Sequence, residues 1–134
     1  MVRAEFAHLN PEEKVIMQRW VNLRPLVGEI TYDIHLNTPD QTWPEHFTEE
    51  DKKRWRYLKD KRIDAICHTR LGNWILEVTP KLTPRTLGEL IMYRDLYLKQ
   101  VPQIKPVKLG AIVELDDPAL HETFRREDIV IWVV

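Results

Sequence analysis

The chain of 134 residues contains one cysteine and only four glycines. A single cysteine excludes an internal disulfide, and Cys67 is therefore expected to be a buried thiol in an intracellular protein. The scarcity of glycine leaves little scope for a glycine-rich phosphate-binding loop, and the sequence contains none. The chain also has no large excess of positive or negative charge. The net charge is −1, so no overall field draws the chain to nucleic acid or to an anionic membrane.

Long hydrophobic runs are also absent. The apolar run at 129–134, IVIWVV, is far shorter than the roughly 20 residues that a helix needs to span a bilayer. The N-terminal stretch MVRAEFAHLNPEEK carries acidic residues and lacks the apolar segment of a signal peptide. We therefore expect a protein that is neither secreted nor inserted in a membrane.

What is present is ordinary globular material, 43% hydrophobic and 31% charged. A chain of this length can bury a core without disulfides or metal, and we expect one domain over 1–134. Capping and periodicity signals then place the elements. They predict helices at 11–24, 48–60, 83–100 and 117–124, and strands at 29–36, 61–69, 73–80, 106–115 and 129–134.

The order of these elements predicts an antiparallel meander of three strands that passes through a right-handed crossover into parallel strands. The expected fold class is α/β, a mixed central sheet with flanking helices. Strict alternation in EITYDIHL predicts one apolar face made of Ile30, Tyr32, Ile34 and Leu36. The final strand, IVIWVV, is expected to be fully buried.

An acidic residue lies in each strand of the hairpin over 61–80. A connection of even length centred on 71–72 places Thr79 opposite Asp64 and Glu77 opposite Ile66. Asp64 and Glu77 then lie diagonally on one face, within reach of a common ion. A connection of odd length would put them on opposite faces. The even register is favoured because it leaves the other face entirely apolar, with Ile63, Ala65, Cys67, Trp74, Leu76 and Val78.

Two carboxylates on one face repel each other unless something neutralises them. A divalent cation such as Mg²⁺ does so, since it takes one or two carboxylates and keeps several waters. His68 shares this face and is a further candidate ligand. The alternative is that each acid is solvated or paired with a nearby cation, for which Arg62, Lys81 and Arg85 are available.

The segments RIDAI, WILEVT and GELIMY resemble the motifs of the PD-(D/E)XK nuclease superfamily, particularly its RecB-like branch. Asp64 matches the acid of the second core strand and Glu77 the acid of the third. Glu89 and Tyr93 stand at the positions of the glutamine and tyrosine on the following helix. The resemblance implies an αβββαβ core, metal ligands at Asp64 and Glu77, and Mg²⁺-dependent hydrolysis of DNA.

Two departures from this pattern predict a degenerate site. Thr79 stands where the family has a lysine, and its hydroxyl supplies neither a cation nor a base near neutral pH. Glu89 adds negative charge where phosphate must approach. We therefore expect a non-catalytic protein without a cofactor. The alternative is an active Mg²⁺-dependent nuclease whose lysine has been relocated, with Lys61 and Lys108 as candidates.

The stretch 52–62, KKRWRYLKDKR, has seven basic residues in eleven, interleaved with Trp55 and Tyr57. This mixture suits contact with a nucleic-acid backbone and stacking on bases. The residues proposed to bind nucleic acid or another partner are Lys52, Lys53, Arg54, Trp55 and Arg56. A solvated amphipathic surface helix anchored by Trp55 and Leu58 is the alternative. Trp43, in the loop over 37–47, suits either a protein interface or packing over the sheet.

Small chains with YRDLYL after the acid strand and a closing hydrophobic strand resemble proteins encoded among the structural genes of tailed phages. The resemblance implies a component of the virion at the head–tail connector, found in the virion or the host cytoplasm. Its partners would be other protein subunits, with self-association and contact with DNA as further options.

Overall fold

The computed structural model describes residues 8–58, 61–103 and 105–134, the side chains of residues 57 and 58 excepted. Within these residues the helices are α1 (Pro11–Leu23), α2 (Glu49–Leu58), α3 (Pro84–Gln100) and α4 (His121–Arg126), the last preceded by a 3-10 turn at Pro118–Leu120. The strands are β1 (Gly28–His35), β2 (Arg62–Thr69), β3 (Asn73–Lys81), β4 (Val107–Leu115) and β5 (Ile129–Val133). The order of elements is the one predicted. The expected end of the second helix at Asp60 and the side chains of Tyr57 and Leu58 lie outside the described part.

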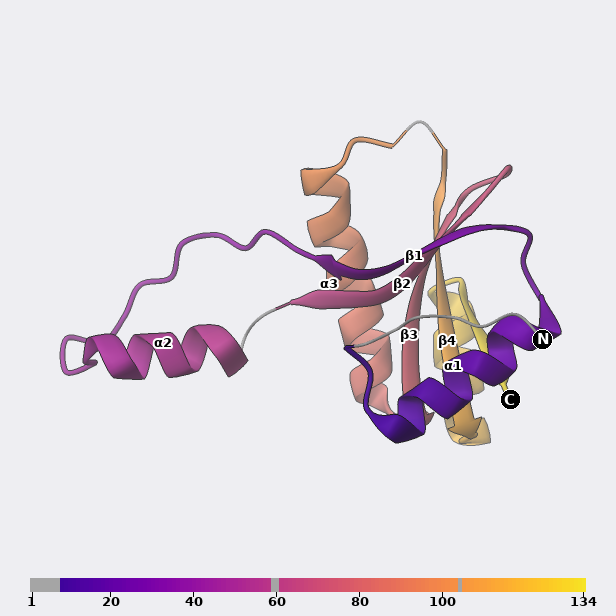
Figure 1. Cartoon of the computed structure of the whole chain (residues 1–134), viewed down its shortest axis with the longest axis horizontal. Helices are drawn as coiled ribbons and strands as arrows, with labels where there is room; N and C mark the ends of the chain where they lie inside the picture. The colour runs from indigo at the N-terminus through magenta and orange to yellow at the C-terminus, as the bar shows by residue number, and fades with distance from the viewer. Residues whose placement is uncertain (1–7, 59–60, 104) are drawn as a thin grey trace.

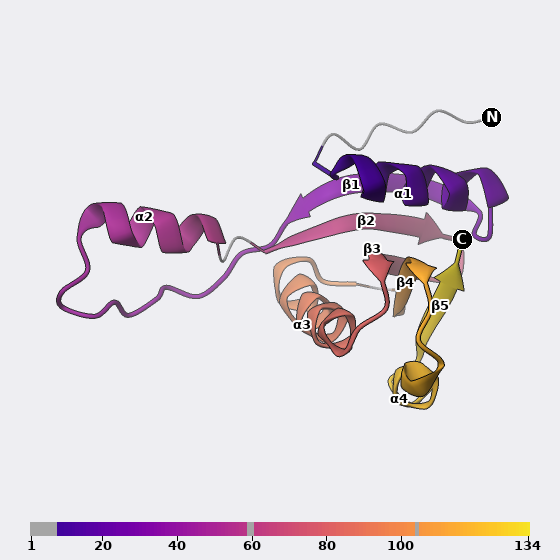
Figure 2. The same ribbon diagram turned by 90° about the horizontal axis from the view of Figure 1, so that it is seen from below.

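The five strands form one mixed sheet in the order β1-β2-β3-β4-β5. The first three strands are antiparallel, while β4 pairs parallel to β3 and β5 parallel to β4. Helix α1 covers one face of this sheet, and α3 and α4 cover the other (Figure 2). The predicted α/β class and the change from antiparallel to parallel pairing are confirmed. No helix in the described ranges is long and apolar enough to cross a membrane.

Helix α1 begins at a complete capping box. The Asn10 side chain accepts from the Glu13 N–H at 2.8 Å, and Glu13 Oε1 accepts from the Asn10 N–H at 3.0 Å. These two bonds satisfy backbone donors that a helix start leaves free. The helix ends at Arg24, whose left-handed φ of 49° turns the chain just before Pro25.

The sheet separates two apolar cores. The α1-side core contains Leu9, Ile16, Met17, Trp20, Val21, Ala65, Cys67, Leu76, Val78 and Ile112. The α3-side core contains Leu36, Ile63, Ile66, Ile75, Leu82, Leu90, Tyr93, Tyr97, Leu109, Ala111, Val113, Phe124 and Ile129. Cys67 is buried, as expected.

Strand β1 does not keep one apolar face, and the alternation predicted for it is wrong. Ile30 and Tyr32 pack on the α1-side core, whereas Ile34 and Leu36 pack on the α3-side core. Asp33 between them has a left-handed φ of 54°. A residue in this conformation breaks the pleat, so the side chains that follow it point to the other face of the sheet.

Strand β2 changes face at the same level. Ile63, which pairs with Ile34, packs in the α3-side core and not with Ala65 and Cys67 as predicted. The pairs on either side of this break, Tyr32–Ala65 and Ile34–Ile63, keep a common register. The irregularity is therefore confined to the level of Asp33 and Asp64.

The β2–β3 hairpin differs from the predicted register by two positions. The Thr69 N–H donates to the Gly72 carbonyl at 3.0 Å, and the Gly72 N–H donates to Thr69 Oγ1 at 3.2 Å. The connection is therefore the pair 70–71, and Ala65 lies across from Leu76. A Cβ at Gly72 would lie 2.7 Å from the Pro106 carbonyl oxygen, which explains the glycine. A shift by two preserves the faces predicted for the remaining hairpin residues.

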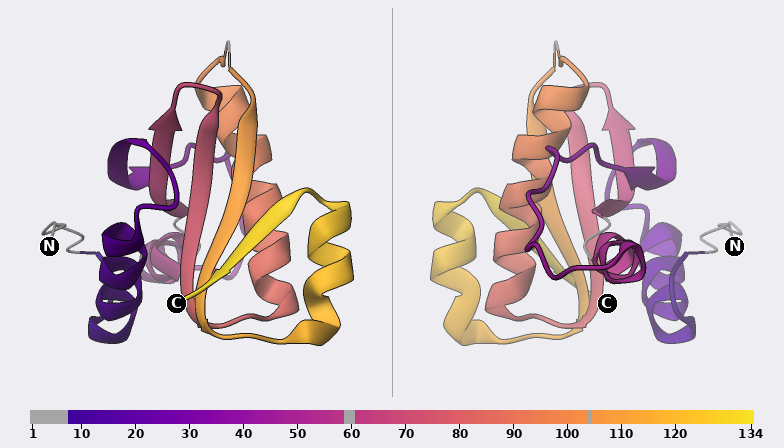
Figure 3. Two further views of the ribbon diagram at one scale, coloured as in Figure 1. Left: turned by 90° about the vertical axis from the view of Figure 1, so that its right-hand side faces the viewer. Right: turned by 90° about the vertical axis from the view of Figure 1, so that its left-hand side faces the viewer.

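Strand β5 is an edge strand and not a fully buried one. Ile129 is buried, but Val130 and Val133 are exposed because no strand pairs beyond them. Helix α4 returns the chain to this edge (Figure 3). Trp132 is half-buried, and its ring packs against those of Trp20 at 5.5 Å and Trp74 at 5.4 Å between centroids.

Residues 37–58, called the arm below, project away from the sheet and carry α2 at their far end (Figure 1). Thr48 and Asp51 cap α2 as predicted, with the Asp51 N–H donating to Thr48 Oγ1 at 3.1 Å and the Thr48 N–H to Asp51 Oδ2 at 3.0 Å. Trp55 is 41% exposed on this helix. The arm therefore leaves α2 largely exposed to solvent.

Two glycine substitutions should separate packing from helix propensity. A Cβ at Gly110 would lie 2.3 Å from Trp132 Cζ3 and 3.0 Å from Leu76 Cδ2, whereas a Cβ at Gly88 meets nothing within 4 Å. Gly110→Ala should lower the free energy of unfolding by about 1–3 kcal/mol through overpacking. Gly88→Ala, on α3, should raise it by up to about 1 kcal/mol. Urea unfolding of both variants measures the difference, and equal effects would contradict the packing of Trp132.

Candidate acid centre

Four of the residues matched to the nuclease motif lie close together. Asp64 lies on β2 one residue beyond Ala65–Leu76, the last regular pair with β3, and its carboxylate reaches the β3 backbone at the Val78 N–H. Glu89 and Tyr93 lie one turn apart on α3. Glu89 raises the pKa of Glu77, and Glu77 and Glu89 both raise the pKa of Tyr93. We call Asp64, Glu77, Glu89 and Tyr93 the acid centre.

Asp64 is held by two groups that the sequence pattern did not reveal. Its Oδ2 accepts from the Val78 N–H at 2.8 Å, and its Oδ1 lies 3.4 Å from His8 Nε2. The first contact ties the carboxylate to the β3 backbone just beyond Ala65–Leu76, which is the last regular pair of the two strands. The second ties it to the segment that precedes α1. Neither partner has a recognisable sequence signal, since both contacts depend on the tertiary fold.

Glu77 is the most perturbed group of the centre. Burial, followed by the charges of Asp64 and Glu89 and hydrogen bonds with their carboxyl groups, raises the pKa of Glu77 well above its usual value. Its Oε2 is buried and has no hydrogen-bond partner among the described residues. Glu77 therefore keeps its proton at pH values where an exposed glutamate has lost it.

Helix α3 contributes Glu89 and Tyr93 to the acid centre. Glu89 pairs with Arg85, with 2.7 Å between Oε1 and Nε, and the Arg85 side chain is 86% exposed. Burial and the neighbouring carboxylates Glu77 and Glu89 raise the pKa of Tyr93 above its usual value. The phenol thus stays protonated, and the Arg85 guanidinium is directed to Glu89.

The position of the family lysine supplies no cation. The Thr79 hydroxyl donates to the Lys81 carbonyl at 3.3 Å. Lys108 lies over the Trp74 ring at 5.4 Å, and Trp74 packs on the α1-side core, on the opposite face from Glu77. Lys61 lines a pocket at the base of the arm. These contacts do not support the alternative in which Lys108 or Lys61 serves as a relocated lysine beside the acids.

The remaining candidates around the acids have other contacts. His68 Nε2 lies 3.0 Å from Thr31 Oγ1, and its Nδ1 lies 3.2 Å from Asn73 Oδ1, near the hairpin turn. His68 is thus not a member of the acid centre. Arg62 lies 3.5 Å from an oxygen of Asp33, and Lys81 is exposed.

The fit of these residues to Mg²⁺ is poor. In the part of the chain that the structure describes, no three His, Cys, Asp or Glu side chains form a group that could hold a metal ion. Asp64 uses one oxygen for the Val78 N–H, and Glu77 retains a proton. A metal would have to displace that proton and rely on two carboxylates together with water.

The basic residues predicted to bind a partner all lie on the arm, but their surroundings differ. Lys52 pairs with Glu49 at 3.2 Å. The Arg56 guanidinium lies over the Trp43 ring, 5.5 Å from its centroid. Lys53 and Arg54 are exposed. The contact between Arg56 and Trp43 joins α2 to the loop over 37–47, two segments that the sequence indicated as separate candidates for binding a partner.

No family model, curated protein or solved structure matches this chain. The structure establishes an α/β fold with helices on both faces of a five-stranded mixed sheet. The nuclease interpretation therefore rests on the motif residues and on their convergence at the acid centre.

The raised pKa of Glu77 predicts a pH-dependent stability. Because the folded state binds this proton more tightly than the unfolded state, the free energy of unfolding should fall as pH rises from the unfolded pKa through the folded one. Glu77→Gln mimics the protonated acid and lacks this dependence. It should stabilise the protein by roughly 1–3 kcal/mol at about pH 8 and much less at about pH 5.

Urea unfolding at both pH values measures the effect, and Glu45→Gln in the exposed loop of the arm is the matched control. A variant that is less stable than the wild type at the higher pH would show that the Glu77 carboxylate is ionised and stabilising in the folded protein.

Proposed function

We propose that this chain is a non-catalytic module of nuclease-like fold that works by binding other protein subunits. The observation that carries the proposal is the closed acid centre. The Glu77 carboxyl is buried between two other carboxyl groups, which together with burial raise its pKa, Asp64 is bound to backbone, and Thr79 stands in place of a cation.

Hydrolysis of a phosphodiester needs positive charge where the transition state gathers negative charge. The acid centre offers the reverse, because three carboxyl groups meet there and Arg85 is already paired with Glu89. A phosphate approaching Asp64 would meet repulsion. The centre therefore serves the fold, by joining β2, β3 and α3, rather than chemistry.

An apolar surface at one end of the molecule supports a role in assembly. Val27 is 87% exposed and Leu71 is 70% exposed. They line a hollow of about 320 Å³ where the α1–β1 connection meets the β2–β3 hairpin, together with the apolar Pro25, Leu26 and Trp74 and the polar Thr69, Arg70 and Lys108. Exposed apolar side chains that gather in one place mark protein contact sites more often than isolated ones do.

Placement at the head–tail connector of a tailed phage rests on the sequence resemblance. The genes that flank this one test it directly. Capsid, portal and tail genes beside it support an assembly role, whereas repair or recombination genes favour catalysis.

An active Mg²⁺-dependent DNA nuclease is the second candidate. The observation in its favour is that Asp64 and Glu77 lie near each other on adjacent strands, with Glu89 and Tyr93 of α3 beside them. In this function Asp64 and Glu77 would hold the ion through their carboxylates, and Glu77 would lose its proton on binding.

Cleavage assays separate the two candidates. The purified wild type should leave single-stranded and double-stranded DNA intact in the presence of Mg²⁺ or Mn²⁺, because the centre lacks a cation and a base. Asp64→Ala is the matched control. Metal-dependent cutting by the wild type that disappears in Asp64→Ala would overturn the proposal, while cutting that persists in the variant arises outside this site.

The apolar surface provides a test of assembly. Products of the flanking genes, co-expressed with this chain, should form a complex that co-elutes in size-exclusion chromatography. Leu71→Lys should weaken that complex at least about tenfold, as expected for a buried contact residue. Leu98→Lys, at a 43% exposed site on α3, should not. The absence of a complex with every flanking product, or equal effects of the two variants, would contradict this surface.

A further inference from the structure

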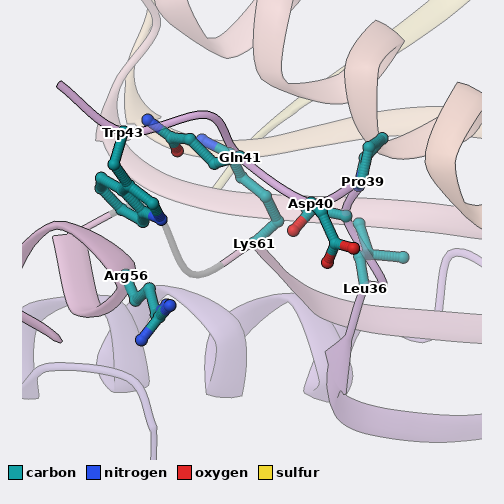
Figure 4. Close-up of a pocket in the computed structure, with 8 residues that line it drawn as sticks. Leu36, Pro39, Asp40, Gln41, Trp43, Arg56 and Lys61 are labelled. Atoms are coloured by element: carbon teal, nitrogen blue, oxygen red, sulfur yellow. The ribbon is translucent and has the colours of Figure 1, made fainter. Parts of the chain in front are cut away.

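A pocket of about 370 Å³ lies at the base of the arm, between the loop that leaves β1 and helix α2 (Figure 4). Trp43 and Arg56 stand at one end of it and Pro39 and Leu36 at the other. The volume is within the usual range for small-molecule sites of roughly 300–1,000 Å³. The residues that line it are Leu36, Thr38, Pro39, Asp40, Gln41, Trp43, Arg56 and Lys61.

The pocket is anchored to the sheet and does not depend on loop residues alone. Leu36 is 6% exposed and belongs to the α3-side core. Its N–H donates to the Lys61 carbonyl at 2.9 Å, which joins the start of the loop to the start of β2. Lys61 and Leu36 thus have fixed backbone positions at one wall.

Two cations line this pocket, Arg56 and Lys61, against one acid, Asp40. Among the described residues neither cation has a carboxylate within ion-pair distance, whereas Lys52 on the same helix is paired with Glu49. Unpaired arginine and lysine side chains in a concave site favour an anion, and phosphate in particular.

The end of the pocket formed by Trp43 and Arg56 offers a flat surface. The Arg56 guanidinium lies over the Trp43 ring at 5.5 Å, and Phe47 packs near the same ring at 5.8 Å between centroids. These contacts hold Trp43 in a half-buried position at the pocket wall. Aromatic rings and guanidinium planes are the groups on which unpaired bases stack.

We propose that this pocket binds one nucleotide of a single-stranded nucleic acid. Arg56 and Lys61 take the phosphate, and the base stacks against the Trp43–Arg56 pair. Asp40 and Gln41 supply an acceptor and an amide for the polar edges of base and sugar. The exposed cations Lys53 and Arg54 extend the positive surface along α2 for the neighbouring phosphates.

A single strand fits these features better than a duplex or an acidic polypeptide. In a duplex the bases are paired and stacked inside, and none is available to a pocket of one-base size. An acidic polypeptide would use the cations but leave the aromatic wall without a partner. The inference goes beyond the proposed function and does not depend on it, since it involves no metal and no cleavage.

Fluorescence anisotropy with a labelled oligothymidylate of about 12 nucleotides tests the proposal, because this length matches the site sizes of single-strand binders. The full chain should bind this oligonucleotide, and the affinity should fall as salt rises from about 50 to 200 mM. The double variant Arg56→Gln/Lys61→Gln should bind at least about tenfold more weakly and show a shallower dependence on salt. Arg125→Gln/Arg126→Gln, at two exposed sites on α4, removes the same two positive charges and should bind like the wild type.

The aromatic wall is tested by Trp43→Phe and Trp43→Ala. Phe keeps a stacking face and should retain most of the affinity, whereas Ala should lose several-fold, and circular dichroism checks that α2 remains folded. Three results would overturn the proposal: equal binding of a duplex of the same length, no loss in Arg56→Gln/Lys61→Gln, or equally tight binding of polyglutamate. The last result would identify the arm as a surface for acidic proteins.

Discussion

The carboxylate of Asp64, set between two strands, determines the arrangement of the acid centre. Regular pairing of β2 and β3 stops at Ala65–Leu76, and the Val78 N–H beyond it finds its acceptor in Asp64 Oδ2. Buried backbone donors need such a partner, so the side chain replaces a missing ladder bond. Because Asp64 occupies this position, Glu77 is held against it and under α3. The left-handed Asp33 at the same level of β1 allows β1 and β2 to change face there.

A protonated glutamate is the natural outcome of this geometry. Three carboxyl groups within one buried cluster cannot all be charged without large repulsion, and the group with the least access to water keeps its proton. The neutral acid avoids the repulsion that a third charge would add. An acid pair of this kind satisfies the sequence motif of a metal site while meeting a structural need, and for this reason motif residues alone do not distinguish the two roles.

The extent of each element could be predicted because its signals are local. The capping boxes at Asn10–Glu13 and Thr48–Asp51 are short sequence patterns with a direct physical effect. The hairpin register could not be predicted to better than two positions, since it depends on the approach of Gly72 to Pro106. The change of face at Asp33 needs a left-handed aspartate, which alternation of residue types does not reveal. The contacts of His8 with Asp64 and of Trp43 with Arg56 join segments that only the fold brings together.

The packing of Trp20 against Trp132 has a consequence for the order of folding. It joins the first helix to the last strand, across nearly the whole length of the chain. The antiparallel strands β1 to β3 can pair early, because their partners are close in sequence, whereas β4 and β5 must wait for long connections to close. During synthesis the Trp132 ring reaches Trp20 and Trp74 only after β5 leaves the ribosome. A chain halted before residue 129 therefore lacks the ring that covers these two tryptophans, and that part of the α1-side core stays open to solvent.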